Sequence, residues 1–150
     1  MVTNMDTGGT LFKFTVFLVF TTLLLMVVGQ ELDPEKMYKM CQQKSNATDD
    51  ELSSFLKSQS IPTTEHGKCL LACIFENTGV LTKEGKYNAD GIYEMAKRSY
   101  DKSPEQLVKA KKVVDTCAKE VEDSVNKCEA AVKAANCTMV VSQKVGLGSA

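Results

Sequence analysis

The chain has 150 residues, a formal net charge of −1 at pH 7 and 25% charged residues. A length of this order predicts a single domain. The balanced charge offers no electrostatic basis for binding nucleic acid or an anionic membrane surface, so neither is expected as a partner.

The N-terminal segment has the pattern of a targeting signal. Residues 14–28 are uncharged and largely apolar, Lys13 precedes them and Gly29 follows them. This pattern predicts a signal peptide over residues 1–29 and a secreted, extracellular domain over residues 30–150. The alternative is an uncleaved membrane anchor, but this run of 15 residues is shorter than the roughly 20 that span a bilayer, so stable membrane insertion is not expected.

Two short helices are predicted at the start of the mature domain. Asp33-Pro34-Glu35 combines a capping residue, a first-turn proline and an acid, and it opens the first helix. Thr48 or Asp49 opens the second, which directs Leu52, Phe55 and Leu56 inward. Between them, Asn46-Ala47-Thr48 is an N-glycosylation sequon, and we expect Asn46 to be its acceptor.

The run Cys69-Leu70-Leu71-Ala72-Cys73-Ile74-Phe75 has no charged position and predicts a central helix that is covered on several sides. Pro62, Thr63 and Thr64 mark its start and Gly79 marks its end. Cys69 and Cys73 lie four residues apart, which places their β-carbons about 5–6 Å apart, whereas a disulfide needs about 3.5–4.5 Å. Each of these cysteines must therefore bond a different segment.

Three more helices are predicted in the second half, and each begins at a capping signal: Asn88 or Asp90, Ser103-Pro104, and Asp123 or Ser124. The last of them is expected to end near Cys137. In the tail, Thr138–Ala150, Gly146 and Gly148 disfavour a helix, and the apolar tail residues predict an extended strip that lies against the body. No strand pattern appears, so the predicted fold class is all-α with about six helices.

All six cysteines lie after the predicted signal peptide, at positions 41, 69, 73, 117, 128 and 137. In a secretory chain they predict three disulfides. Structural zinc is the competing interpretation, but the short paired C-x-x-C knuckles of such sites are missing, so neither a metal nor a cofactor is expected. Six cysteines allow 15 pairings, and excluding the three that contain a 69–73 bond leaves about 12 open.

No catalytic residues are predicted, and the chain is not expected to be an enzyme. His66 is the only histidine, every cysteine is accounted for as half of a disulfide, and no G-x-S-x-G nucleophile elbow or glycine-rich phosphate loop occurs. We expect His66 to be a surface residue near the start of the central helix, with a pH-responsive role as the alternative.

The cysteine spacing resembles that of a known family. Successive cysteines are separated by 27, 3, 43, 10 and 8 residues, which is similar to the six-cysteine pattern of the insect odorant-binding proteins, pheromone-binding and general-odorant-binding members included. The phrases Cys69–Phe75 and Gly85-Lys86-Tyr87-Asn88-Ala89-Asp90 also resemble that family, and the likeness covers the whole mature chain. It implies six helices around an internal apolar cavity, no catalysis, and interlocked disulfides Cys41–Cys73, Cys69–Cys128 and Cys117–Cys137.

These expectations together describe a secreted carrier that binds a small hydrophobic ligand, such as an odorant or pheromone, and transports it through aqueous fluid. An odorant receptor is a further expected partner, and a homodimer is compatible with the sequence. The tail is expected to close the cavity mouth as a lid. One polar group among Tyr93, Tyr100 and Thr138 is expected to orient a ligand oxygen. The predicted ligand-binding residues lie on inward helix faces and in the tail: Phe55, Leu56, Ile74, Phe75, Ile92, Met95, Leu107, Val114 and Leu147.

Two other interpretations stay open at this point. A saposin-like helical protein that acts on membranes or assembles with a partner would also have six cysteines and amphipathic helices, although its cysteine spacing fits poorly. A venom or gland-secretion protein of the same fold, without a chemosensory role, would show the same sequence features.

Overall fold

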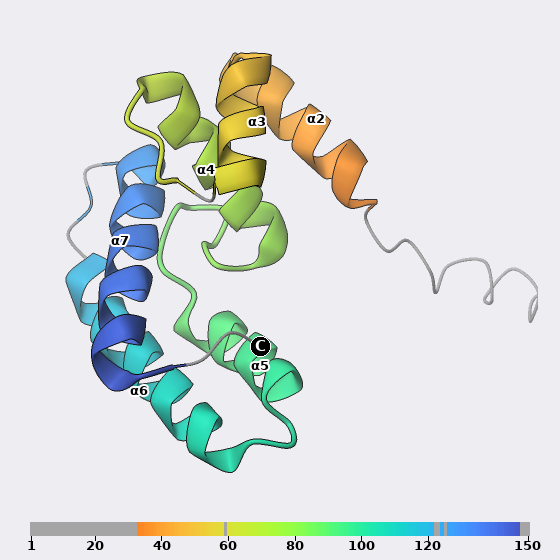
Figure 1. The fold of residues 1–150 in the computed structure, drawn as a ribbon. Helices are drawn as coiled ribbons and strands as arrows, with labels where there is room; N and C mark the ends of the chain where they lie inside the picture. The colour runs from red at the N-terminus through yellow and green to blue at the C-terminus, as the bar shows by residue number, and fades with distance from the viewer. Residues whose placement is uncertain (1–32, 59, 122–123, 125, 148–150) are drawn as a thin grey trace, which may run out of the picture. The chain divides into compact units, whose positions relative to one another are not determined.

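The structure of the chain is a computed structural model that describes residues 33–58, 60–121, 124 and 126–147. The predicted signal peptide, residues 1–29, lies outside the described residues. The unit that begins at Pro34 contains all the helices of the described residues. They are α2 (Pro34–Ser45), α3 (Asp49–Ser58), α4 (Glu65–Thr78), α5 (Ala89–Ser99), α6 (Pro104–Val121) and α7 (Lys127–Val145) (Figure 1).

The all-α prediction is confirmed. In the described part of the chain, β-pairing is limited to one isolated bridge between Leu81 and Tyr87, in the connector of residues 79–88 that leads from α4 to α5. None of the helices in that part is both long and apolar enough to cross a bilayer.

Capping residues set the ends of the central helices where the sequence predicts them. Thr64 is the N-cap of α4, and its hydroxyl accepts a hydrogen bond from the Gly67 N–H at 3.0 Å. Gly79 ends α4 in the left-handed conformation with φ 83°, and its N–H donates to the carbonyl of Phe75. Asn88 caps α5 through its side chain. These contacts satisfy backbone groups that helix ends would otherwise leave unpaired.

The six cysteines form three disulfides, and the pairing is the one that the family resemblance implied. Cys69 and Cys73, on one face of α4, bond different helices, as their spacing required. The sulfur–sulfur distances are 2.04, 2.06 and 1.99 Å for the pairs Cys41–Cys73, Cys69–Cys128 and Cys117–Cys137. Because the three loops that they close overlap along the chain, the bonds are interlocked.

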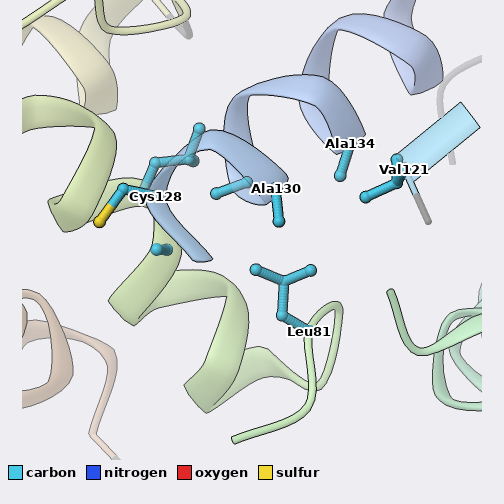
Figure 2. Close-up of a cluster of buried hydrophobic side chains, with 8 residues drawn as sticks. Leu81, Val121, Cys128, Ala130 and Ala134 are labelled. Atoms are coloured by element: carbon cyan, nitrogen blue, oxygen red, sulfur yellow. The ribbon is translucent and has the colours of Figure 1, made fainter. Parts of the chain in front are cut away.

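The core consists of three groups of buried side chains. The α4–α7 cluster contains Leu71, Ala72, Leu81, Val121, Cys128, Ala130, Ala131 and Ala134. The α2–α4 cluster contains Met37, Cys41, Ala47, Leu70, Cys73 and Ile74. The α6–α7 cluster contains Val113, Cys117, Cys137 and Val141. In the first of these, the side chain of Leu81 points from the connector toward Ala130 of α7 (Figure 2). Two of the three groups include residues of α4, which confirms its predicted central position.

A carboxylate on α4 adds an electrostatic link to this core. The side chain of Glu76 is 11% exposed, and its Oε1 lies 2.8 Å from Lys127 Nζ at the start of α7. Its other oxygen lies 3.9 Å from Lys44 Nζ at the end of α2. Because a nearly buried charge needs partners of opposite sign, these contacts favour one arrangement of α2, α4 and α7.

The prediction of an extended tail is wrong for residues 138–145, which continue α7. Gly146 is the residue that ends this helix: it has φ 64°, and its N–H donates to the carbonyls of Ser142 and Gln143. Glycine disfavours a helix interior but suits the position just after a helix. Gly146 therefore indicates where α7 ends, and it does not argue against a helix before it. The start of α7 also differs from the prediction, because Asn126 rather than Asp123 or Ser124 is the N-cap.

Three side chains that were expected to face the body are exposed instead. Leu56 of α3 is 45% exposed, so the prediction that it turns inward is wrong. Met139 and Val140 of α7 are 48% and 43% exposed. In contrast, Val141 is buried and Val145 packs half-buried against the α6–α7 cluster. Because these tail residues belong to a helix, some of them face the core and others face solvent.

Candidate ligand-binding site

Helices α3 and α5 are amphipathic, yet neither contributes a buried residue, although both lie wholly in the described part. On α5, Ile92, Tyr93 and Met95 are half-buried, whereas Glu94 and Lys97 are exposed. An amphipathic helix normally buries its apolar stripe against other protein atoms. The stripe of α5 is only partly covered, so it offers apolar surface to something other than the rest of this chain.

Two phenylalanines provide a second incompletely covered apolar surface, next to the core. Phe55 of α3 and Phe75 of α4 are both half-buried, and both pack against the α4–α7 cluster and the α2–α4 cluster. Val132 and Ala135 of α7 also pack, partly buried, against the first of these. Segments far apart in the sequence therefore supply half-buried apolar side chains around one cluster. We call Phe55, Phe75, Val132 and Ala135 the apolar wall.

The structure places the predicted ligand-binding residues in different environments. Phe55 and Phe75 meet in the apolar wall. Ile92 and Met95 of α5 and Leu107 of α6 are half-buried, on two helices that contact each other. The rest lie elsewhere: Ile74 and Val114 are each 4% exposed within the packed interior, Leu56 is exposed, and Leu147 packs half-buried against the α6–α7 cluster. Ligand contact by each of the nine stays a prediction.

A carboxylate joins α3 to α4 beside Phe55. Glu51 accepts hydrogen bonds from the Thr48 N–H at 2.7 Å and from the hydroxyl of Thr64, the N-cap of α4. These bonds, the one from Thr64 first, hold the pKa of Glu51 below its usual value, and the charge of His66 contributes to the same effect. Glu51 and Phe55 line one pocket of about 250 Å³ with residues 60–64. His66 is exposed in the first turn of α4, as predicted.

The tail begins in contact with α6. The Lys109 ammonium donates to the Gly146 carbonyl at 3.2 Å, just after the end of α7. Leu147 packs half-buried against the α6–α7 cluster. Residues 148–150 lie outside the described residues, so the predicted lid over a cavity mouth can be followed only as far as Leu147.

Tyr87, in the connector, is a half-buried tyrosine that packs against the α4–α7 and α6–α7 clusters. Burial raises the pKa of Tyr87 to about 12, and a polar interaction with the side chain of Thr138 opposes this rise in part. Sequence reasoning missed Tyr87, because residues outside helices have no face that periodicity could assign.

Tyr93, a candidate from the sequence, lies in a charged environment instead. The ammonium groups of Lys97 and Lys111 lie 5.2 and 5.8 Å from its ring centroid. Such cation–π contacts stabilise the packing of α5 on α6 at the surface. These contacts account for the position of Tyr93 without a bound ligand.

Asn46, the predicted glycosylation site, lies exposed at the turn between α2 and α3 with φ 54°. Asparagine is among the few side chains that adopt this left-handed conformation at little cost, so the position has a structural reason of its own. Glycan attachment at Asn46 stays a prediction.

Comparison with known proteins gives consistent results. The model of the PBP/GOBP family matches residues 27–140. General odorant-binding protein 28a of Drosophila melanogaster is 36% identical over 107 residues, which cover 71% of this chain and 73% of that protein.

Solved structures give the same picture of the fold. The odorant-binding protein OBP28a from Drosophila melanogaster superposes with a TM-score of 0.64 at 31% identity, over 76% of this chain and 93% of that one. A fatty acid binding protein, OBP56a from the oral disk of the blowfly Phormia regina, superposes with a TM-score of 0.55 over 77% of this chain and 99% of that one; at 16% identity it bears on the fold alone. The family match, which covers well over half of the chain, and the identity to a curated relative agree with the disulfide pairing: the chain belongs to the PBP/GOBP family of odorant-binding proteins.

Proposed function

We propose that this protein is a secreted carrier that holds a small hydrophobic molecule against the apolar wall and the stripe of α5, and transports it through aqueous fluid. Membership of the odorant-binding family supports a carrier of small hydrophobic ligands. The observation that carries the proposal in this chain is the apolar stripe of α5, which the rest of the described chain covers only in part.

The expected affinity follows from the area that such a ligand would cover. Removing about 300 Å² of apolar surface from water at about 25 cal/mol per Å² gains about 7.5 kcal/mol. A micromolar Kd corresponds to about 8.2 kcal/mol. Because association also costs translational and rotational freedom, we expect affinities in the micromolar range or weaker for ligands of this size.

The proposal also includes secretion, a role without catalysis, and two possible protein partners. Three disulfides suit the oxidising environment of a secreted protein. Transport of a ligand needs no catalytic group, so the proposed role is not enzymatic. Delivery to an odorant receptor and formation of a homodimer are further parts of the proposal, to be measured separately.

A titration of the purified protein with the fluorescent apolar probe N-phenyl-1-naphthylamine tests this function. We expect saturable uptake of one probe per chain. The variant Ile92→Ser should weaken uptake because it places a hydroxyl on the apolar stripe of α5, whereas Glu94→Ser, on the exposed face of the same helix, should leave it unchanged. Equal uptake by both variants would contradict the site, and partition of the protein onto lipid vesicles without saturable uptake would favour a saposin-like role.

A further inference from the structure

We infer that α5 is a movable lid of the ligand site, which turns about its first residues and is held closed against α6 by the contact between Tyr93 and Lys111. The opening of this lid sets the rates at which a ligand enters and leaves. The inference rests on the proposed carrier function, because the apolar stripe of α5 is part of the proposed binding surface.

The first step is the small number of elements that hold α5. Among the helices of the described part, α6 is the one whose backbone lies close to that of α5. In the same part of the chain, none of the half-buried apolar residues of α5 packs against the α4–α7, the α2–α4 or the α6–α7 cluster. Movement of α5 would therefore uncover little of the packed core. A segment with few buried apolar contacts opens at a low cost in free energy.

The second step is the start of α5, which is held closely. Asn88 Nδ2 donates to the Gly79 carbonyl at 2.9 Å, and the Asn88 N–H donates to the Val80 carbonyl at 2.9 Å. A β-carbon at Gly91 would lie only 2.8 Å from Asn88 Cγ and 2.9 Å from the Gly79 oxygen, so this close approach requires a glycine. Because Gly79 directly follows α4, these contacts fix the start of α5 to the end of the central helix. The helix can therefore turn about this point.

The third step is the middle of α5, where a cation–π contact crosses to α6. The Lys111 ammonium lies 5.8 Å from the centroid of the Tyr93 ring. The same ammonium donates to Asp115 Oδ2 at 2.6 Å, one turn further along α6, and this bond keeps it in position. Lys97, which also lies near the ring, belongs to α5 and moves with it. Opening therefore has to break the contact between Tyr93 and Lys111, which stabilises the closed position.

The fourth step is the far end of α5, which lies at the surface. Residues 97–99 of its last turn are exposed, and so are residues 101–103 of the turn that leads to α6. That turn is closed by a hydrogen bond from the Ser103 N–H to the Tyr100 carbonyl at 3.0 Å. This end can move through solvent without displacing buried groups. Such a movement would take the apolar stripe, with Ile92 and Met95, away from a bound ligand.

Stopped-flow measurement of N-phenyl-1-naphthylamine association and dissociation tests the lid. Lys111→Gln removes the cation, which is present in the closed position with or without a ligand, so both rate constants should rise. We expect an increase of about 2- to 5-fold in each, the range that a surface cation–π contact gives, with the Kd unchanged within about twofold. Lys112→Gln is the matched control, because it removes an equal charge from the exposed face of α6. It should change neither rate constant.

Two variants of Tyr93 repeat this test from the other side of the contact. Tyr93→Leu removes the ring and should raise both rate constants as Lys111→Gln does. Tyr93→Phe keeps a ring for the ammonium and should preserve the wild-type rates.

Gly91→Ala tests the hinge, because its β-carbon would push the start of α5 away from Gly79. Amide hydrogen exchange of this variant should be faster in α5 and unchanged in α4, and the probe should be released faster. In the wild-type protein, exchange should already be faster in α5 than in α4.

The inference is overturned if Lys111→Gln and Tyr93→Leu leave both rate constants unchanged, or if they change the Kd without changing the association rate constant. Amide exchange in wild-type α5 that is as slow as in α4 would also overturn it. A wild-type protein that takes up no probe would instead overturn the proposed carrier function.

Discussion

Two sets of helices in this molecule differ in how completely they are packed. The framework helices α2, α4, α6 and α7 carry all six cysteines and nearly all of the buried side chains. Helices α3 and α5 carry no cysteine and no buried residue. The framework helices therefore hold the chain together through disulfides and close packing, whereas α3 and α5 leave apolar surface only partly covered, and we propose that a ligand binds to such surface.

The largest expected effect comes from truncating one side chain in each set of helices, which tests whether the two sets differ in packing. Leu71 on α4 is 1% exposed, so Leu71→Ala should lower the free energy of unfolding by about 2–5 kcal/mol through lost burial and a cavity. Met95→Ala on α5 removes a half-buried side chain, so it should cost about 1 kcal/mol or less while weakening probe uptake. Denaturant unfolding and probe titration measure both effects. Equal losses of stability would show that α5 is as tightly packed as α4.

Enlarging a side chain of the apolar wall tests whether that side chain borders ligand space or belongs to the packed core. If Phe75 borders space that the ligand uses, Phe75→Trp should fill part of that space and weaken probe binding about tenfold, which corresponds to about 1.4 kcal/mol. In a fully packed core, the same change would instead lower stability, typically by about 1–3 kcal/mol. Isothermal titration and thermal unfolding of the same sample distinguish these results. A less stable variant with unchanged affinity would remove Phe75 from the site.

The hydrogen bond from Thr64, the N-cap of α4, to Glu51 of α3 joins the two sets of helices, and a change of Thr64 tests it. Thr64→Ala removes the N-cap of α4 and the hydroxyl that donates to Glu51 on α3, so it should lower the free energy of unfolding by about 1 kcal/mol. Amide hydrogen exchange should rise mainly in α3, because that helix buries no residue of its own. Thr64→Ser keeps the hydroxyl and should behave like the wild type. Exchange that rises equally in α7 would argue against a local junction.

The same junction should respond to acid. Hydrogen bonds from Thr64 and Thr48 lower the pKa of Glu51 from its usual value of 4.5, so its ionised form stabilises the folded state above that pH. This contribution is lost as the pH falls through the lowered pKa. Glu51→Gln should therefore have a lower free energy of unfolding than the wild type at pH 7, and this difference should disappear below about pH 4.5. A difference that stays constant down to pH 3 would exclude the charge of Glu51 as its cause.

The smallest effect on stability is expected at the sequon between α2 and α3. When the protein is secreted from a eukaryotic host, the wild type and Thr48→Ser should carry a glycan that peptide N-glycosidase removes, and Thr48→Asn should carry none. Asparagine is a good N-cap, so Thr48→Asn should keep the contact that Thr48 makes with the Glu51 N–H. Intact mass spectrometry measures the glycan and the N-terminus together. An unmodified wild-type mass would exclude Asn46 as an acceptor.

Most helix starts could be predicted because a cap is a local arrangement. Thr64 and Asn88 lie where the capping preference places them, and Pro104 is the first residue of α6, as Ser103-Pro104 predicted. The tail prediction failed because the composition of residues 138–150 was judged as one block. Gly146 affects only the residues around it, so the tail residues before it, 138–145, remain helical.

The ligand site was less predictable than the fold. Periodicity assigned an inward face to each helix, but it could not distinguish a side chain that fills the core from one that borders accessible space. Ile74 and Phe75 are neighbours in the same predicted set, yet Ile74 is buried and Phe75 is half-buried. Their difference depends on what α2, α3 and α7 place beside them.

The sequence by itself determined the helical class, the divergence of Cys69 and Cys73, and most helix ends, because each depends on residues within one or two turns of one another. The tertiary structure alone decided which apolar faces are left incompletely covered, and it alone packed Tyr87 of the connector against the α6–α7 cluster. Cys137 of that cluster lies 50 positions after Tyr87, and packing over that separation depends on the helices between them.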